Sequence, residues 1–241
     1  MPLFFSLDVP VDGINTYRLE IVDKHPVLIN FLDKKYIIDT GSPVSMTVDN
    51  QPFLLCGKSN ESSSLNIMDT VVSLSGLDVD GIIGLDLLSK YYVLIDYKNK
   101  KISFSSRSFQ MPGKKLTMDK VLGMSAIGFQ ATVNGQPTKC LLDTGAPISY
   151  LAQPRLFDGL ELEKAGQADD FYPGLGHFTT QLYKTNVEIE GVDITVKCGV
   201  LPSLLSLAVS MAGGAILGYD LISQTDGIEL CFNENTIKLA I

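Results

Sequence analysis

The sequence predicts a mainly β protein with two similar lobes, related by a pseudo-twofold axis and carrying only short helices. The main observation is a phrase that occurs twice in the 241 residues, 104 positions apart (143 − 39). Lys, Asp, Thr, Gly, Pro and Ser recur at matching places in KYIIDTGSPVS (35–45) and KCLLDTGAPIS (139–149). Each copy begins with an apolar run typical of a buried strand. The repetition indicates that each lobe brings one Asp to a shared site.

A second motif repeats downstream of the first. DGIIGLDLLS (80–89) is matched by GAILGYDLIS (214–223), and their central glycines, Gly84 and Gly218, are 134 residues apart (218 − 84). Each half therefore has an apolar strand, then Asp-Thr-Gly, and then two apolar residues before Gly-x-Asp-Leu. An isolated Asp-Thr-Gly would indicate only a turn with an Asp capping backbone donors. Two copies with matching partners favour a duplicated functional unit.

The segments around these motifs have the pattern of β-strands. Residues 27–30 align with residues 131–135 at the same offset, and Asn134-Gly135 is typical of a tight hairpin turn. Residues 95–104 and 230–239 each consist of two strand-like runs around a polar turn. Helical periodicity is short and follows the two glycines of the second motif. These patterns predict the mainly β class.

The chain is expected to divide into an N-terminal lobe, residues 1–108, and a C-terminal lobe, residues 109–241. The segment 105–115 is rich in Ser, Pro, Gly and Lys and has no apolar periodicity, as in a connection between lobes. The interval between the two motifs is 45 residues in the first lobe (84 − 39) and 75 in the second (218 − 143). The second lobe therefore contains an insertion.

Composition and charge exclude some classes of protein. Hydrophobic residues make up 45% of the chain, and the net charge of −8 argues against nucleic acid as the main partner. Residues 1–8 have neither a basic region nor a long apolar core, so a cytoplasmic location is expected. Residues 198–219 are uncharged over about the length of a membrane span. Because they contain Pro202 and several Ser and Gly, a strand, a loop or short helix, and a second strand are the preferred interpretation, with no membrane partner.

The cysteines and histidines indicate no metal site. The four cysteines have no close pairs and lie mostly in strand-like runs, so free buried thiols are expected. No Cys-x-x-Cys occurs, and His25 and His177 are far apart in sequence. Both histidines are expected at the surface. We expect neither a metal nor a cofactor.

The two motifs and their order resemble those of the aspartic proteases of the pepsin and retropepsin type. The resemblance spans nearly the whole chain in the order of elements, whereas matches of single residues are confined to the motifs. It implies the two-lobed acid-protease fold with retropepsin-sized lobes. It also implies an aspartic endopeptidase that acts on peptides or proteins. Because one chain holds both halves of the site, a monomer is expected.

The resemblance implies that Asp39 and Asp143 form the catalytic pair. Two adjacent carboxylates cannot both ionise easily, so their pKa values separate, and aspartic proteases are the standard instance of this effect. The ionised Asp would take a proton from water, and the protonated Asp would polarise the peptide carbonyl. This chemistry needs no cofactor.

Neighbouring residues are expected to support the pair: Thr40, Gly41, Ser42, Thr144, Gly145 and Ala146. By resemblance, the two threonines would hydrogen-bond across the lobe interface, and the glycines permit a tight turn beside each carboxylate. The Ser42 hydroxyl is expected to donate to Asp39 and favour its charged form, whereas Ala146 has no such donor. The repeated Asp86 and Asp220 are expected to cap short helices.

The insertion in the second lobe is the candidate flap over the substrate. The resemblance places a glycine-rich hairpin here, at about residues 168–180. Its tip would hold the tentative substrate-binding residues Tyr172, Gly174, Leu175 and Gly176. The alternative is a structural loop that merely contains glycines. Residues 57–64 of the first lobe read as a polar, mobile loop, which departs from pepsin-like enzymes with their main flap in the first lobe.

Two other functions compete with a general endopeptidase. One is a non-catalytic peptide-binding module on the same fold, although such a module has no need of two Asp residues. The other is a processing enzyme with a single protein substrate. The sequence itself indicates neither the cleavage specificity nor the pH optimum.

Overall fold

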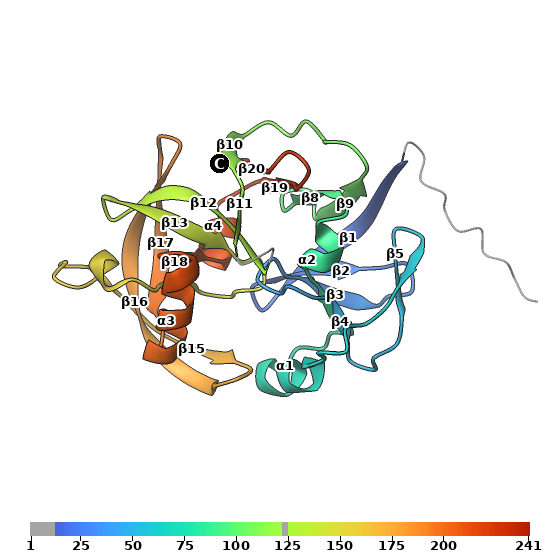
Figure 1. Ribbon diagram of the computed structural model, residues 1–241, viewed down its shortest axis with the longest axis horizontal. Helices are drawn as coiled ribbons and strands as arrows, with labels where there is room; N and C mark the ends of the chain where they lie inside the picture. Colours follow the sequence, from blue (N-terminus) through green and yellow to red (C-terminus); the bar gives the residue numbers. More distant parts are fainter. Residues whose placement is uncertain (1–12, 122–124) are drawn as a thin grey trace, which may run out of the picture.

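The computed structural model describes residues 13–121 and 125–241 and shows a mainly β protein with a few short helices. Two large sheets lie side by side, one built chiefly from the first half of the chain and one from the second (Figure 1). The predicted mainly β class, with two similar halves and only short helices, is confirmed. Residues 1–8, on which the expected location rests, lie outside the described residues.

The first large sheet has ten strands in the order β10-β20-β19-β8-β9-β1-β2-β3-β7-β4. Their bounds are β1 (Ile14–Val22), β2 (His25–Ile29), β3 (Lys35–Ile38), β4 (Met46–Thr47), β7 (Gly81–Ile83), β8 (Tyr92–Asp96), β9 (Lys101–Ser105), β10 (Lys114–Thr117), β19 (Gly227–Cys231) and β20 (Thr236–Leu239). The first half also contains the separate pair β5 (Phe53–Leu55) and β6 (Lys58–Asn60) and the helices α1 (Met68–Ser75) and α2 (Leu85–Leu88).

The second large sheet has eight strands in the order β11-β12-β13-β18-β14-β17-β16-β15. Their bounds are β11 (Asp119–Val121), β12 (Ala126–Val133), β13 (Gln136–Leu142), β14 (Ser149–Leu151), β15 (Lys164–Tyr172), β16 (Gly176–Ile189), β17 (Val192–Val200) and β18 (Ala215–Leu217). The helices here are α3 (Ser203–Ala212), α4 (Tyr219–Ile222) and the 3₁₀ turn η2 (Pro154–Leu156).

The long uncharged segment folds as expected, because β17 is followed by α3 and then by β18. Over residues 13–121 and 125–241, no helix is long and apolar enough to cross a membrane. The expected turn at Asn134-Gly135 also forms, between β12 and β13. All four cysteines are free, three of them buried and Cys56 half-buried.

The repeat in sequence is a repeat in topology. In the first half, β3 runs parallel to β7, with Ile38 opposite Ile83, and β4 pairs antiparallel with β7. In the second half, β13 runs parallel to β18, with Leu142 opposite Leu217, and β14 pairs antiparallel with β18. Each Asp-Thr-Gly thus follows a buried central strand whose parallel neighbour is the second motif.

The end of the chain returns to the first sheet. Both expected hairpins form, β8–β9 and β19–β20, and they join edge to edge where β19 pairs with β8 (Figure 1). One continuous core includes buried side chains from both halves, among them Phe104 and Phe129. The two halves are therefore joined by backbone hydrogen bonds and by shared packing.

A buried carboxylate fixes the segment that connects the two halves. Glu229 of β19 is fully buried and accepts hydrogen bonds from Ser108 Oγ (2.6 Å), the backbone amides of Phe109 (2.8 Å) and Met111 (3.0 Å), and Lys238 Nζ (2.9 Å). Burial raises the pKa of Glu229, but these donors outweigh it, so its pKa lies below the usual value. The connection is thereby held against β19.

The first-lobe segment expected as a mobile loop is partly a strand. Residues 58–60 form β6, which pairs with β5. Phe53 and Leu55 of β5 are buried, and the backbone amide of Cys56 donates to Tyr17 Oη at 2.7 Å. Apolar side chains on β5 thus hold this hairpin against the core of its own lobe, which the polar composition of residues 57–64 did not reveal.

Candidate active site

The two repeated Asp residues begin equivalent loops. Asp39 follows β3, and its backbone amide donates to the carbonyl of Ile83 at 3.0 Å. Asp143 follows β13, and its amide donates to the carbonyl of Leu217 at the same distance, 3.0 Å. The second motif therefore anchors the first in each half.

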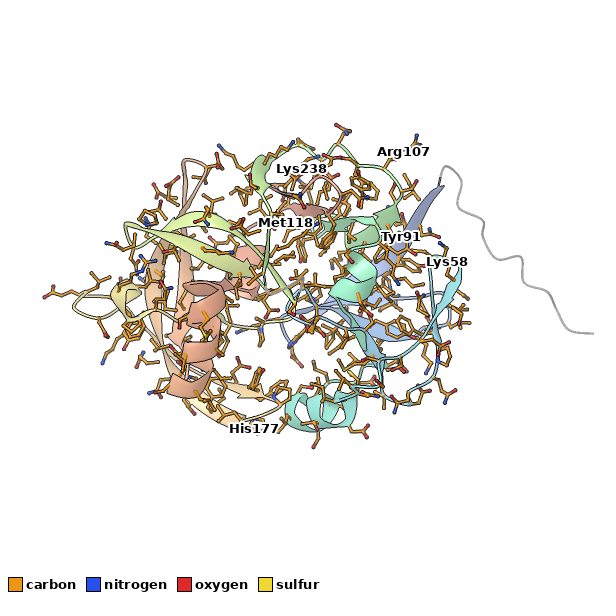
Figure 2. All side chains as sticks on the ribbon, viewed as in Figure 1. Lys58, Tyr91, Arg107, Met118, His177 and Lys238 are labelled. Carbon is orange, nitrogen blue, oxygen red and sulfur yellow. The ribbon has the colours of Figure 1, made fainter. Side chains whose placement is uncertain are left out.

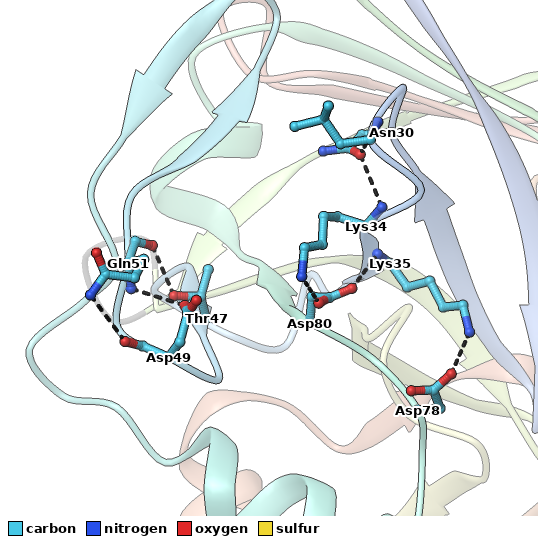
Figure 3. A network of polar contacts seen from close by, with 9 residues as sticks. Asn30, Lys34, Lys35, Thr47, Asp49, Gln51, Asp78 and Asp80 are labelled. Carbon is cyan, nitrogen blue, oxygen red and sulfur yellow. Dashed lines mark hydrogen bonds and ion pairs between the residues drawn. The ribbon is translucent and has the colours of Figure 1, made fainter.

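A polar network secures the other end of β3 (Figure 3). Lys34 Nζ contacts Asp80 Oδ1 at 2.6 Å, and the backbone amide of Lys35 donates to Asp80 Oδ2 at 2.9 Å. Lys35 Nζ contacts Asp78 at 2.5 Å, and Asn30 Oδ1 accepts the amide of Lys34 at 3.0 Å. Exposed ion pairs stabilise little by themselves. Here they align the start of β3 with the segment before β7.

Backbone amides hold the two carboxylates. Asp39 Oδ1 accepts from Gly41 N (2.8 Å) and Ser42 N (3.0 Å), and Asp143 Oδ1 accepts from Gly145 N (3.0 Å). The Ser42 hydroxyl donates instead to the carbonyl of Val44 at 2.7 Å, so the predicted side-chain donor is wrong. Its backbone amide takes that role because the loop turns around the carboxylate.

The two carboxylates interact with each other, since each changes the pKa of the other. A Cβ atom on Gly41 would lie 2.3 Å from Asp143 Oδ2, and one on Gly145 would lie 2.4 Å from Asp39 Cγ. Each glycine thus approaches the carboxyl group of the opposite loop. A side chain at either position would push the two Asp residues apart, which explains why both motifs end in glycine.

The two threonines cross-link the loops as the resemblance implied. Thr40 N donates to Thr144 Oγ1 and Thr144 N donates to Thr40 Oγ1, both at 3.0 Å. Thr40 Oγ1 donates to the carbonyl of Leu142 (2.7 Å), and Thr144 Oγ1 donates to that of Ile38 (2.6 Å). Both threonines are fully buried, so the four bonds form a symmetric link that bulk solvent does not reach.

The environments of the two Asp residues differ. Removal from water raises the pKa of Asp143 well above its usual value, and the charge of Asp39 raises it further. Removal from water also raises the pKa of Asp39, but two amide donors, Asp143 and His25 oppose that rise. Of the two, Asp143 therefore has the environment that favours the protonated form more strongly.

The repeated Ser and Asp around the second motif support the loops. Ser45 Oγ accepts from Gly84 N at 2.9 Å, and Ser149 Oγ accepts from Gly218 N at 3.0 Å. The predicted helix caps are wrong, because the N-cap residues of α2 and α4 are Gly84 and Gly218. Asp86 lies inside α2 and accepts from Ser45 Oγ at 2.6 Å, so it orients that serine.

A cleft of about 560 Å³ lies over the carboxylates, a size typical of ligand sites. Residues of both halves line it, and most of them are apolar. The first half contributes His25, Ile37, Asp39, Gly41, Ser42, Pro43, Met46, Ile67, Thr70, Val71, Leu77 and Ile82. The second half contributes Asp143, Gly145, Ala146, Pro147, Tyr150, Asp170, Phe171, Tyr172, Pro173, Gly174, Phe178, Leu201, Leu205 and Ile216.

The insertion of the second lobe forms the hairpin β15–β16, here called the flap hairpin, with its tip at residues 173–175. Leu175 N donates to the carbonyl of Tyr172 at 2.8 Å, which closes the turn. Tyr172 and Gly174 line the cleft, whereas Leu175 and Gly176 are not among its lining residues. Gly176 has a φ of 83°, a conformation that favours glycine.

The flap hairpin reaches the first half of the molecule. Phe171 packs against a first-half cluster that includes Val27 and Val71. Helix α1 faces the flap hairpin at the lower side of the molecule (Figure 1) and contributes Thr70 and Val71 to the cleft. The cleft is therefore covered from both halves, by a hairpin on one side and a helix on the other.

The predicted surface position of His25 is wrong. It begins β2, is only 7% exposed and lines the cleft, with Nδ1 3.3 Å from the carbonyl of Val22. His177 is exposed on the outer edge of the flap hairpin (Figure 2) and does not line the cleft. Sequence reasoning also missed Tyr150 and Asp170. Asp169-Asp170 was a visible signal, but strand alternation alone does not tell which of two neighbours faces inward.

Comparisons with known proteins give similarity only at the level of structure. No family model matches the chain, and no curated protein matches it. Among solved structures, the chain is similar to a retropepsin-like aspartic protease from Rickettsia conorii, with 20% identity and a TM-score of 0.36. The match covers 53% of this chain and 89% of that one.

Proposed function

We propose that the chain is an aspartic endopeptidase that activates water between Asp39 and Asp143. One observation carries the proposal. Two carboxylates, each from a duplicated Asp-Thr-Gly loop and each beside the glycine of the opposite loop, line one cleft that both halves of the chain form. The apolar walls of this cleft suit an extended peptide with apolar side chains.

The proposed mechanism assigns different roles to the two Asp residues. Asp39, ionised, takes a proton from water while the water oxygen attacks the carbonyl carbon of the peptide. Asp143, protonated, donates a hydrogen bond to the carbonyl oxygen and stabilises its developing charge. The C–N bond then breaks, and the proton that Asp39 took from water passes to the leaving nitrogen. The pair returns to one proton and one charge.

A non-catalytic peptide-binding module is the second candidate. The observation that favours it is the position of β5–β6, which packs against its own lobe and leaves the cleft with a single flap hairpin. Against it stands the geometry of the carboxylates, because a binding cleft gains nothing from two adjacent buried acids, one of which raises the pKa of the other.

Peptide hydrolysis tests the proposal. The chain is incubated with a diverse peptide library between pH 3 and pH 8, with and without a statine-type inhibitor, and new termini are identified by mass spectrometry. We expect cleavage between apolar residues that the inhibitor suppresses. Inhibitor binding without cleavage would favour the binding module, and cleavage that the inhibitor leaves unchanged would exclude the carboxylate mechanism.

We also propose that the active unit is a monomer, since one chain supplies both Asp-Thr-Gly loops. Specific activity is then expected to stay constant on dilution into the nanomolar range. The measurement is the initial rate per chain over a dilution series, together with sedimentation. A steep loss of activity that coincides with dissociation of a dimer would contradict this expectation.

The flap hairpin is expected to control turnover through its tip. Gly176→Val forces a branched side chain into a left-handed conformation and stiffens the tip, so kcat/KM is expected to fall at least about tenfold. Gly135→Val is the matched control, because Gly135 also lies at a hairpin end with φ 76° and open surroundings, on β12–β13. Both variants are expected to lose about 1–2 kcal/mol of stability.

Steady-state kinetics and thermal unfolding of the two variants separate the effects. Equal losses of kcat/KM in Gly176→Val and Gly135→Val would show that the hairpin acts only through stability. Hydrogen exchange adds a second readout, since a bound statine-type inhibitor is expected to protect residues 168–180 more than residues 57–64.

A further inference from the structure

Asp170 places a third carboxylate in the cleft. It lies on β15, next to the tip of the flap hairpin, and is half-buried. Its Oδ2 atom accepts from Tyr150 Oη at 2.5 Å, and its Oδ1 atom accepts from the backbone amide of Phe171 at 2.8 Å. Tyr150 itself is buried on β14. Both donors that hold this carboxylate therefore belong to the second half of the chain, and neither is one of the two Asp residues of the repeated motifs.

The surroundings of Asp170 favour a cation. The acidic and basic side chains that line the cleft are those of Asp39, Asp143, Asp170 and His25, and no Lys or Arg occurs among the lining residues. Removal from water raises the pKa of Asp170, opposed by Tyr150, the Phe171 amide, His25 and Lys24. Removal from water also raises the pKa of Tyr150, which keeps its hydroxyl protonated as a donor.

Each oxygen of Asp170 accepts one hydrogen bond from the protein and can accept another. A neutral substrate side chain would leave this carboxylate poorly solvated and without a full complement of donors, which is unfavourable. A lysine or arginine side chain would supply charged donors, and its methylene groups would contact apolar neighbours such as Phe178. A glutamate would be repelled.

We propose that Asp170 forms a subsite that selects peptides carrying a lysine or arginine side chain among apolar residues. The proposal rests on the proposed function in taking a peptide as the occupant of the cleft. His25 faces the same carboxylate from the first half, and Lys24 lies at the adjacent end of β1–β2.

The neighbouring Asp169 provides a matched control. Its side chain is on the other side of β15, accepts from Thr179 Oγ1 at 2.6 Å, is exposed and does not line the cleft. Asp169→Asn and Asp170→Asn remove the same charge from adjacent positions of one strand. Any long-range effect of the lost charge on peptide binding is common to both variants. The difference between their peptide affinities therefore measures the contribution of the Asp170 subsite.

The experiment measures binding, so that it does not depend on turnover. Statine-type peptides with either lysine or norleucine at each position in turn are titrated calorimetrically into the wild-type chain and the two variants at pH 7. At one position, we expect the lysine peptide to bind at least about tenfold more tightly to the wild type and to Asp169→Asn. In Asp170→Asn this ratio is expected to fall below about threefold, and in Asp170→Glu to be partly kept.

Three outcomes would overturn the inference: equal affinities of the wild type for both peptides at every position, an unchanged ratio in Asp170→Asn, or the same loss in Asp169→Asn. Failure of the proposed function looks different. In that case the lysine preference is present and depends on Asp170, but no corresponding peptide with an ordinary amide bond is cleaved.

Discussion

Asp39→Asn and Asp143→Asn are each expected to lower kcat/KM for peptide hydrolysis at least about 10³-fold, the largest effect expected of any substitution in this chain. Either change removes the single proton and single charge that the pair shares. The asparagine side chain has nearly the same shape and can still accept from the loop amides at positions 41, 42 and 145. The fold is therefore expected to persist.

The measurement is steady-state kinetics on a peptide found in the library, with thermal unfolding as the check on folding. The double variant is expected to be no worse than either single variant, because the two carboxylates act as a unit. Asp169→Asn serves as the control for a loss of charge outside the pair. Activity of either single variant within about tenfold of the wild type would refute the assignment of the pair.

Thr40→Val is expected to have the largest effect on stability. Its hydroxyl accepts from Thr144 N and donates to the carbonyl of Leu142 in a fully buried position, so valine leaves one donor and one acceptor unpaired. Each such group costs about 1–3 kcal/mol, and a total loss of about 2–4 kcal/mol is expected. Thr144→Val is expected to behave alike, since its bonds are equivalent.

Urea unfolding measures these losses, with Thr16→Val as the control. Thr16 is exposed and shares one hydrogen bond with Ser103 Oγ at 2.8 Å, so its loss is expected to cost less than about 1 kcal/mol. The double variant Thr40→Val/Thr144→Val is expected to cost less than the sum of the single variants, because they share partners. A Thr40→Val loss no larger than that of Thr16→Val would show that the link between the loops carries no stability.

The features that the sequence predicted are those encoded locally. The strands before Asp39 and Asp143 are apolar runs, and the repeated glycines mark the turns after them. The flap hairpin could also be placed, because its glycines interrupt two strand-like runs. In each case, a short stretch of sequence contains the whole pattern that predicts the strand or the turn.

Features that depend on contacts between distant segments could not be predicted. The hairpins β8–β9 and β19–β20 were expected, but nothing in their sequences shows that β19 pairs with β8. His25 was expected at the surface. Packing of β2 inside the sheet brings it to the cleft instead. The Tyr150–Asp170 contact likewise joins two strands that are not neighbours in the sheet.

The wrong assignments around the site share a physical cause. Ser42 and Asp86 were given the roles that their side chains usually have, a hydroxyl donor and a helix cap. In the folded chain, backbone amides hold Asp39, and glycines occupy the cap positions because the second motif passes close to the loops. A Cβ on Gly84 would lie 2.5 Å from the carbonyl oxygen of Val44. Such close approaches are properties of the tertiary structure.

The pH dependence of kcat/KM tests the central claim, that one proton is shared between Asp39 and Asp143. The proposed mechanism requires Asp39 ionised and Asp143 protonated, so the rate is expected to rise with pH as the pair loses its first proton. It is then expected to fall as the pair loses its second. Because burial and the charge of Asp39 raise the pKa of Asp143 well above its usual value, the falling limb is expected well above the usual range of a carboxyl group. A bell-shaped profile is the predicted result. A rate that rises steadily to pH 8 without a falling limb would contradict the account.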